Sequence, residues 1–277
     1  MGGCCTRTKT LETVVQRPPV AMQIQGSVVL ITGAARGLGR CFAETLLGRG
    51  AKVCVTDIDS EAGAECVAEL QAQHGSDNAM FFKCDVTKDE DFNGAWDATV
   101  EKFGPVTLLV NNAGLGNEQN WQLTLNVNIG GCTRGTLLAL ERMGVNKGGA
   151  GGSVVNISSI TGLKPAPFGP IYGATKHAIV GLTRSLGHDF HHKTSKVTVQ
   201  ALCPSLVQTD LLVNSSKTAF SSEVAAAMLK LGGAIKVMTP EYVAEALVKL
   251  IEEGHNGGCM VVEAEKEPYF VEAPVPL

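Results

Sequence analysis

The chain has 277 residues, 44% of them hydrophobic, and a formal net charge of −4. This length supports a large core within one α/β domain, and no apolar run approaches the ~20 residues of a membrane span. Lys and Arg are dispersed, so we expect no nucleic-acid partner. The nine Cys form no CxxC motif and no Cys/His cluster, which predicts reduced thiols, a cytoplasmic location and no metal site.

Residues 1–23 show no sustained hydrophobic period and are predicted to be a flexible tail before a single domain at 24–277. The tail begins MGGCCT, which fits the N-myristoylation pattern with Gly2 as the acceptor, and Cys4 and Cys5 could take palmitate. One acyl chain binds membranes only marginally, whereas two signals can hold a protein at a membrane surface. The alternative is an unmodified terminus.

From residue 27 onward, short apolar runs alternate with helical patterns. Strands are predicted at 28–31, 51–56, 80–83, 106–110, 154–157, 197–202 and 259–262, and helices include 40–48, 60–74 and 89–103. Continuously apolar strands are typical of a parallel sheet that is covered on both faces. We therefore predict a single α/β domain of the Rossmann type, with a doubly wound parallel seven-stranded sheet and a ligand site at the carboxyl ends of its strands.

The first strand and first helix are joined by a glycine-rich turn. Gly33 permits a tight turn, Gly37 a close approach of a pyrophosphate, and Gly39 close packing of the helix. A helix N-terminus adds unpaired amides and positive potential for phosphates. A glycine turn without a ligand is the alternative, but the order of strand, turn and helix favours dinucleotide binding.

Two charged residues near this turn bear on which dinucleotide binds. Asp57 ends the second strand, where a carboxylate can bond ribose hydroxyls and repels a 2′-phosphate. Arg36 lies within the turn and could instead meet a 2′-phosphate. Repulsion between the Asp57 carboxylate and a 2′-phosphate in contact with it is hard to offset by a cation in the neighbouring turn. The sequence therefore favours NAD, and an NADPH-dependent carbonyl reductase is the alternative.

Tyr172 and Lys176 are four residues apart and would project from one face of a helix. An ammonium near a phenol favours the phenolate, so the pKa of the tyrosine is expected to fall from about 10. Such a phenol can act as a general base or acid toward an alcohol. Taken alone, such a pair is more often two surface residues of an ordinary helix.

Further segments follow the order of motifs in the short-chain dehydrogenase/reductase family, which residues 25–262 resemble. The matching segments are the turn from Thr32 to Gly39, Cys84-Asp85-Val86, Asn111-Asn112-Ala113-Gly114, Leu125 to Ile129, Asn156 to Ser159, and Tyr172 to Lys176. Pro204-Ser205 stands where the family usually has Pro-Gly, and Thr209 matches a Thr near the nicotinamide amide.

The resemblance implies a catalytic set and a cofactor site. Tyr172 would take the alcohol proton, Lys176 would lower the pKa of Tyr172, Ser159 would bond the substrate oxygen, and Asn128 would hold a relay water. The implied cofactor contacts are Gly33, Arg36, Gly37, Leu38, Gly39, Asp57, Asp85, Val86, Asn112, Ala113, Gly114, Tyr172, Lys176, Pro204, Val207 and Thr209. A homodimer is expected by analogy, and a non-catalytic dinucleotide-binding scaffold is the remaining alternative.

Within the family, the chain most resembles hydroxyprostaglandin dehydrogenase and insect alcohol dehydrogenase-like members, through residues 117–121 and 176–184. Gly169 replaces a Gln of the prostaglandin enzyme. The resemblance therefore implies a lipophilic alcohol, retinoid-like, prostanoid-like or a sterol. We expect Ser159, Phe168, Gly169, Tyr172 and Leu211 to contact it, with residues 205–235 as an apolar lid and Leu163 beside Phe168. Ordinary helix packing could also explain the apolar residues of the lid.

Overall fold

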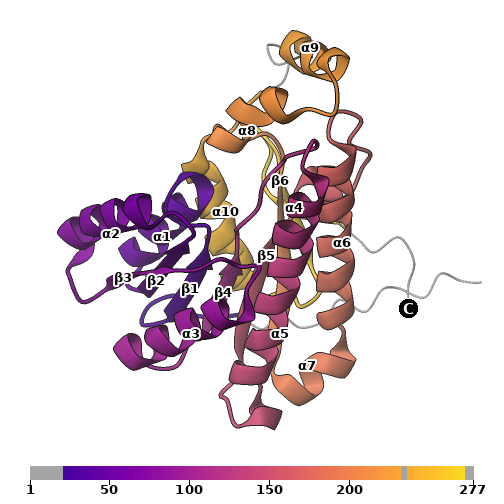
Figure 1. The fold of residues 1–277 in the computed structure, drawn as a ribbon. Coiled ribbons are helices and arrows are strands. Elements are labelled where there is room, and N and C mark those ends of the chain that lie inside the picture. The colour runs from indigo at the N-terminus through magenta and orange to yellow at the C-terminus, as the bar shows by residue number, and fades with distance from the viewer. Residues whose placement is uncertain (1–20, 232–235, 272–277) are drawn as a thin grey trace, which may run out of the picture.

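The computed structural model describes residues 21–231 and 236–271. A central sheet is covered by helices on both faces (Figure 1). The strands are β1 (Val28–Thr32), β2 (Lys52–Asp57), β3 (Ala79–Lys83), β4 (Leu108–Asn111), β5 (Gly152–Ile157), β6 (Val197–Pro204), β7 (Cys259–Val262) and β8 (Tyr269–Phe270). The helices are α1 (Gly37–Gly48), α2 (Ser60–His74), α3 (Asp89–Phe103), α4 (Trp121–Leu125), α5 (Cys132–Met143), α6 (Pro170–Leu186), α7 (Asp189–Ser195), α8 (Asp210–Asn214), α9 (Ser222–Leu231) and α10 (Pro240–Glu253). Short turns are η1 (Asn126–Gly131), η2 (Val145–Lys147), η3 (Ile160–Gly162) and η4 (Ser215–Thr218).

The sheet has the order β3-β2-β1-β4-β5-β6-β7-β8, and β1 to β7 are parallel. This confirms the predicted Rossmann-type fold, with one correction to the predicted strand count of seven. An eighth strand, β8, pairs antiparallel with β7 through Met260 with Phe270 and Val261 with Tyr269. Two residues are too few for a hydrophobic period to reveal a strand, and only the pairing partner defines it.

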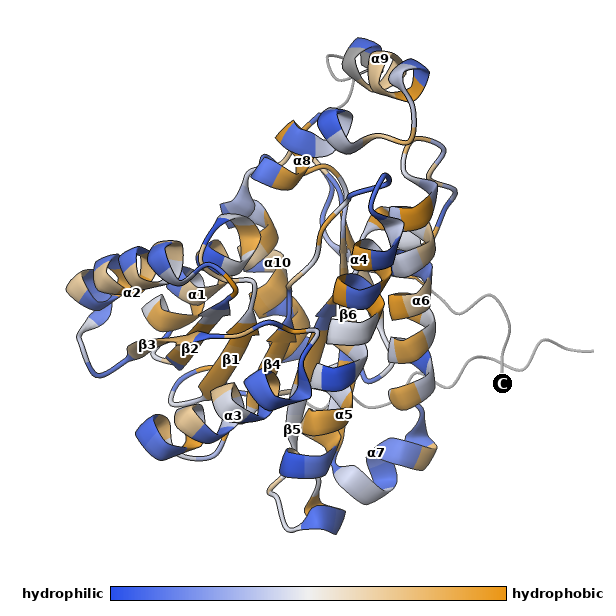
Figure 2. Ribbon diagram, viewed as in Figure 1, coloured by the Kyte–Doolittle hydropathy of each residue, from blue (hydrophilic) through white to orange (hydrophobic). Residues whose placement is uncertain are grey.

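The core consists of two layers, one on each face of the sheet. Alternate strand residues such as Val29 and Ile31 pack with α1, α2 and α10. The residues between them, such as Leu30, pack with α3 and α5. Successive side chains of a strand point to opposite faces, which explains why β1 is apolar at consecutive positions from Val28 to Ile31. β1 and β4 are accordingly drawn mainly in orange (Figure 2).

The chain winds outward from the centre of the sheet in two directions. β1 lies between β2 and β4, so the connection from β3 to β4 crosses back over β1 and β2. Reversal of the winding direction leaves a crevice beyond the carboxyl ends of β1 and β4, where ligands bind in folds of this kind. The predicted nucleotide turn follows β1, and Asn112 follows β4.

The segment predicted to be a lid leaves the sheet after β6 and lies beyond the carboxyl ends of the strands as α8, η4 and α9 (Figure 1). Its base is closed by a bridge between Val207 and Met238. The amide of Met238 donates to the carbonyl of Leu206 at 2.9 Å, and the amide of Gln208 donates to the carbonyl of Met238 at 3.0 Å. The chain therefore leaves the body of the domain after Val207 and returns to it at Met238, just before α10.

The folded body already includes the last part of the predicted tail. The amide of Met22 donates to the carbonyl of Ile251 at 3.3 Å, and Ile24 is buried in the core. The predicted lipidation sites Gly2, Cys4 and Cys5 lie outside the described residues. Within residues 21–231 and 236–271, no helix is both long and apolar enough to cross a membrane.

Candidate active site

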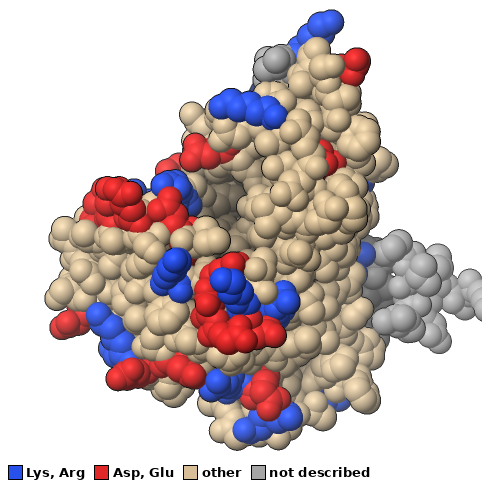
Figure 3. All heavy atoms as spheres, viewed as in Figure 1, with Lys and Arg blue, Asp and Glu red and all other residues tan. Residues whose placement is uncertain are grey.

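A cleft of about 700 Å³ opens at the carboxyl ends of the strands. Figure 3 shows it as a hollow between α1, α4 and α8. Nearly all the predicted cofactor and catalytic residues line it together: Gly33, Arg36, Gly37, Leu38, Asp57, Asp85, Val86, Asn112, Ala113, Gly114, Ser159, Tyr172, Lys176, Pro204, Val207 and Thr209. Segments that are far apart in the sequence thus form one site.

The glycine-rich turn has the geometry that a bound pyrophosphate needs. Gly33 and Gly37 have φ values of 62° and 54°, a region that residues with a side chain rarely adopt. A Cβ on Gly33 would lie 2.7 Å from the Cα of Ala113, and one on Gly39 would collide with the carbonyl of Gly33. The side chain of Arg36 makes no capping bond at α1, so the first amides of the helix face the cleft as phosphate donors.

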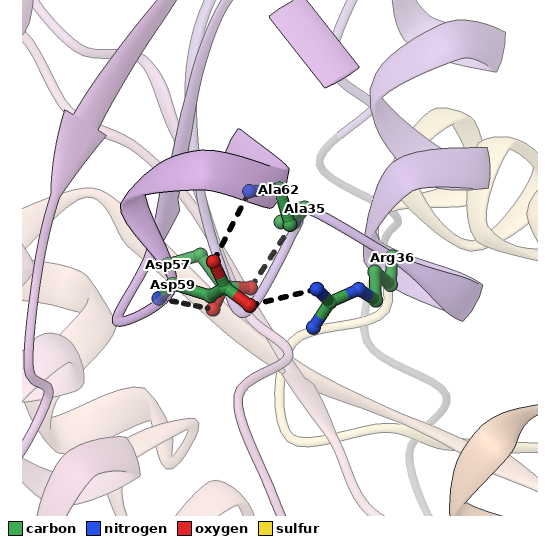
Figure 4. A network of polar contacts seen from close by, with 5 residues as sticks. All are labelled: Ala35, Arg36, Asp57, Asp59 and Ala62. Carbon is green, nitrogen blue, oxygen red and sulfur yellow. Dashed lines mark hydrogen bonds and ion pairs between the residues drawn. The ribbon is translucent and has the colours of Figure 1, made fainter. Parts of the chain in front are cut away.

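The charges near the turn form a closed network (Figure 4). The Asp57 carboxylate accepts from the amides of Ala35 and Asp59, both at 3.1 Å. The Arg36 guanidinium bonds the Asp59 carboxylate at 2.7 Å, and the other Asp59 oxygen accepts from the amide of Ala62 at 3.1 Å. The Ala62 amide and then Arg36 lower the pKa of Asp59. Arg36 is therefore paired with an exposed acid, which makes it less available to a 2′-phosphate.

Two other cofactor residues hold the floor of the cleft. Asn112 Nδ2 donates to the carbonyls of Thr32 at 2.9 Å and Gly33 at 2.8 Å, which ties the end of β4 to the glycine turn. The Asp85 carboxylate accepts from the amide and the hydroxyl of Thr87 at 3.0 and 2.7 Å. Burial raises the pKa of Asp85, but the bonds from Thr87 outweigh it and the net pKa is lowered. Asp85 thus remains a carboxylate beside the cofactor position.

Ser159, Tyr172 and Lys176 meet at the inner end of the cleft. Ser159 Oγ accepts from the amide and hydroxyl of Thr161 at 3.1 and 3.0 Å and donates to the carbonyl of Pro204 at 3.4 Å. Lys176 Nζ donates to the carbonyl of Ile157 at 2.8 Å and lies 5.4 Å from the centre of the Tyr172 ring. The serine is therefore oriented by neighbours in η3 and β6, and the lysine by the carbonyl of Ile157 at the end of β5.

The protonation of this pair differs from the sequence expectation. Burial raises the pKa of Tyr172 to about 12, partly opposed by the hydrogen bond with Ser159. Burial also lowers the pKa of Lys176 to about 8. The expected lowering of the tyrosine pKa by Lys176 is absent because the ammonium faces Ile157 and both groups are desolvated. At neutral pH the phenol is protonated, and Lys176 remains mostly charged.

Asn128 lies in the π-helical turn η1 between α4 and α5 and is buried. Its Oδ1 accepts from the amide of Leu115 at 2.9 Å, and its Nδ2 donates to the carbonyl of Leu115 at 2.9 Å and to Thr175 Oγ1 at 3.0 Å. Asn128 therefore clamps the loop after β4 against the helix that carries Tyr172. Isolated π-turns are rare and frequently occur at functional sites.

The predicted substrate residues are not all in one place. Leu211 lines the cleft together with Ser159 and Tyr172, whereas Phe168 and Gly169 are not part of its lining. Leu163 packs instead with the cluster around Val180, which β6 and β7 complete. Phe168 and Leu163 are therefore not among the residues that line this cleft, whose apolar lining near Leu211 includes Leu115, Leu123, Val127, Ile160, Leu206 and Leu212.

One residue of the site was missed by the sequence analysis. Glu118 is 5% exposed, and its two carboxylate oxygens accept from the amides of Ile171 at 2.9 Å and Tyr172 at 2.8 Å. It belongs to the segment 117–121 that carries a family resemblance, but nothing in the spacing indicates that a loop residue reaches the start of α6. The only signal is an acidic residue in an otherwise uncharged segment.

Comparison with known proteins agrees with this geometry. Residues 27–219 match the model of the short chain dehydrogenase family. The 15-hydroxyprostaglandin dehydrogenases [NAD(+)] of Bos taurus and Homo sapiens are each 38% identical over 253 residues, covering 90% of this chain and 95% of theirs. Alcohol dehydrogenase 2 of Ceratitis cosyra is 30% identical and covers 87% and 92%. A short-chain dehydrogenase of Burkholderia phymatum, solved in complex with NAD, superimposes with a TM-score of 0.76 at 29% identity, covering 87% and 90%.

The chain belongs to the short-chain dehydrogenase family. It is an NAD-dependent oxidoreductase that acts on an alcohol or its carbonyl. The glycine turn, the Asp57 network and Asp85 fit this cofactor, because each offers a partner for a separate part of a dinucleotide without a 2′-phosphate.

Proposed function

We propose that this enzyme interconverts a lipophilic alcohol and its carbonyl, with retinoid-like, prostanoid-like and sterol alcohols as the candidate substrates. The observation that carries this proposal is the set of apolar side chains that line the cleft together with Ser159 and Tyr172. Pockets of this kind bind a ligand through apolar contacts and orient it with a few polar groups. The similarity to 15-hydroxyprostaglandin dehydrogenases supports an alcohol carried on a hydrocarbon chain.

In the oxidising direction, the chain itself has to position the alcohol and remove its proton. Ser159 donates a hydrogen bond to the substrate oxygen, and Tyr172 accepts the hydroxyl proton as general base. Bound NAD supplies the hydride acceptor. Lys176 places its positive charge beside Tyr172 and favours the phenolate once a ligand draws the ammonium away from Ile157.

Asn128 contributes through its clamp on Leu115. Both of its amide protons and one lone pair of Oδ1 have protein partners, which leaves a single lone pair for the expected relay water. Its main effect is to fix the loop from Gly114 to Gly116, where Gly116 lies against Tyr172 and Leu211. The loop thereby shapes the substrate side of the cleft.

Gly169 bears on which alcohol is accepted. The prostaglandin enzyme has a Gln at this position, whereas Gly169 has no side chain to reach a substrate hydroxyl, and it lies outside the cleft lining. Orientation of the substrate oxygen then depends on Ser159 and Tyr172 alone. We therefore favour a substrate whose recognition is chiefly apolar over one with several hydroxyl groups to be matched.

A panel of retinols, prostaglandins and sterols tests the proposal. Formation of NADH, followed at 340 nm or by fluorescence, should occur with at least one lipophilic alcohol and not with NADP at the same concentration. Tyr172→Phe should lower kcat by at least about 10³-fold while NADH still binds. Preference for short polar alcohols, or near-wild-type turnover by Tyr172→Phe, would contradict the assignment.

Two further proposals concern assembly and location. A homodimer is proposed by analogy with other members of the family. The N-terminal MGGCCT supports acylation at Gly2, Cys4 and Cys5 and attachment to a membrane surface. Light scattering of the purified protein tests the first, since a monomeric mass contradicts it. Intact mass from native cells tests the second, since an unacylated terminus contradicts it.

A further inference from the structure

We infer that Glu118 is a positioning residue for the catalytic base, because its carboxylate holds the first turn of the helix that carries Tyr172. The inference rests on the proposed function for the role of Tyr172 as general base. The contacts of Glu118 with the first turn of α6 are independent of that function. Glu118 lies 53 and 54 residues before its two partners, so only the tertiary fold brings them together.

The start of α6 lacks a cap of its own. Gly169 occupies the N-cap position and has no side chain, and Pro170 follows as the first helical residue. The next two amides, of Ile171 and Tyr172, have no acceptor within the helix, as is general for a first turn. Glu118 supplies both acceptors, one oxygen for each amide, at 2.9 and 2.8 Å. A single side chain thus replaces the missing cap.

The burial of Glu118 indicates that this arrangement is specific. Among the described residues, it is the only acidic side chain that is buried. A buried carboxylate is costly unless it is fully hydrogen-bonded, and here two amides and the positive end of the α6 dipole compensate the charge. A solvent-exposed Ser or Asp at the N-cap would stabilise the helix equally well, so helix stability alone does not account for Glu118.

Glu118 is itself held by the lid. Its amide donates to the carbonyl of Thr218 at 3.0 Å, and Thr218 Oγ1 donates to the carbonyl of Gly116 at 2.9 Å. Gln119 Nε2 donates to the carbonyl of Ala219 at 3.2 Å. The loop that carries Glu118 therefore contacts η4 on one side and α6 on the other, and it links the lid to the phenol.

The consequence for catalysis is geometric. Tyr172 is the third residue of α6, so a shift of this first turn moves the phenol relative to Ser159, which is fixed by β6 and Thr161. A displacement of about 1 Å at a reacting group can cost on the order of 10²-fold in rate. Glu118 does not line the cleft, so its loss should leave cofactor binding unchanged.

The test compares Glu118→Gln and Glu118→Ala with Thr239→Ala in the full-length protein. Thr239 caps α10 through the amide of Tyr242 at 3.4 Å and does not line the cleft, so its variant reproduces the loss of a helix cap elsewhere. With an alcohol from the panel, we expect kcat to fall about 10-fold for Gln and about 10²-fold for Ala, with the Kd for NADH within about twofold of wild type. Thr239→Ala should keep the wild-type kcat.

Amide hydrogen exchange gives a readout that needs no substrate. Exchange of the Ile171 and Tyr172 amides should be at least about 10-fold faster in Glu118→Ala and unchanged in Thr239→Ala, since only the former removes their acceptor. If no alcohol is oxidised by the wild type, the proposed function fails while exchange still tests Glu118. Unchanged exchange, or a kcat within twofold of wild type in Glu118→Ala, would overturn the inference.

Discussion

At the scale of single residues, the chemistry depends on where charges are paired and where they are desolvated. By residue type, Arg36 favours a 2′-phosphate and Asp57 opposes it. In the structure Asp59 pairs with Arg36, so Asp57 is the charged residue near the turn that bears on cofactor preference. Tyr172 and Lys176 are a familiar pair by spacing, but burial shifts both pKa values toward the neutral forms. Neither outcome follows from residue type.

The Asp59–Arg36 pair predicts a second determinant of cofactor preference. Asp57→Ser removes the repulsion of a 2′-phosphate and should raise kcat/KM for NADP. Adding Asp59→Asn frees Arg36 while retaining the cap of α2, because Asn caps as well as Asp. The added change should raise kcat/KM for NADP by about 10-fold, the worth of one charge-assisted hydrogen bond. Steady-state kinetics with both dinucleotides check this, and equal NADP values for the single and double variants would contradict it.

The buried ammonium of Lys176 is expected to lower the free energy of unfolding of the native protein while serving catalysis. Its native pKa of about 8 lies below the ordinary 10.5, so the native protein loses this proton before the unfolded chain does. Below pH 8 the buried ammonium is a constant cost, and between pH 8 and 10.5 the stability of the wild type rises with pH. Lys176→Met should therefore be more stable at pH 7, by up to roughly 3 kcal/mol, and inactive.

Urea unfolding at pH 7 and pH 9.5 measures this difference. The gain from Lys176→Met should shrink markedly at the higher pH, because the wild type has by then lost the charge. Lys83→Met, which removes an exposed ammonium, serves as the control and should show no such dependence. A gain that is equal at both pH values would contradict the buried charge as its cause.

At the scale of elements, the active site is assembled by connections rather than by the strands themselves. The glycine turn, the loop after β4, η1, the start of α6 and the lid each contribute one part, and β1, β4, β5 and β6 fix their positions. Function in such folds resides in loops positioned by a rigid scaffold. The lid adds the apolar surface that the strands, which are fully covered, cannot offer.

Leu211 in α8 tests the role of the lid. It lines the cleft, is 40% exposed, and lies with Tyr172 around Gly116. Leu211→Ala should raise KM for a long-chain lipophilic alcohol by about 10-fold, as expected from partial loss of buried leucine surface. KM for a short-chain alcohol and Kd for NADH should not change. A uniform rise in KM for alcohols of all lengths would indicate that α8 packs the fold rather than the substrate.

At the scale of the whole molecule, the cleft joins both halves of the sheet. The proposed cofactor contacts come in part from the β1–α1 turn and β2, and the proposed reacting groups come from the end of β5 and from α6. Binding across this crevice should stabilise the entire domain. At about 100 times its Kd, NADH should add about 2.7 kcal/mol, and Tm should rise by roughly 5–10 °C.

Thermal unfolding with NADH and with NADPH at equal concentrations provides the measurement. NADPH should give a much smaller shift, because Asp57 faces the ribose position and Arg36 is engaged with Asp59. Equal shifts with the two dinucleotides would contradict the cofactor assignment.

Sequence patterns were sufficient to predict the seven parallel strands, the helices around them and the nucleotide turn, and to nominate Asn128, Ser159, Tyr172 and Lys176 as candidate catalytic residues. These features depend on local patterns, namely apolar runs, glycines at fixed spacing and a tyrosine–lysine pair. Such patterns can be recognised in the amino-acid sequence without knowledge of the fold. Only the tertiary structure decided the eighth strand, the pairing of Arg36 with Asp59, the pKa shifts of Tyr172 and Lys176, and the cap that Glu118 provides for α6. Each of these depends on a partner or a degree of burial supplied by a distant segment, and the fold alone brings such segments together.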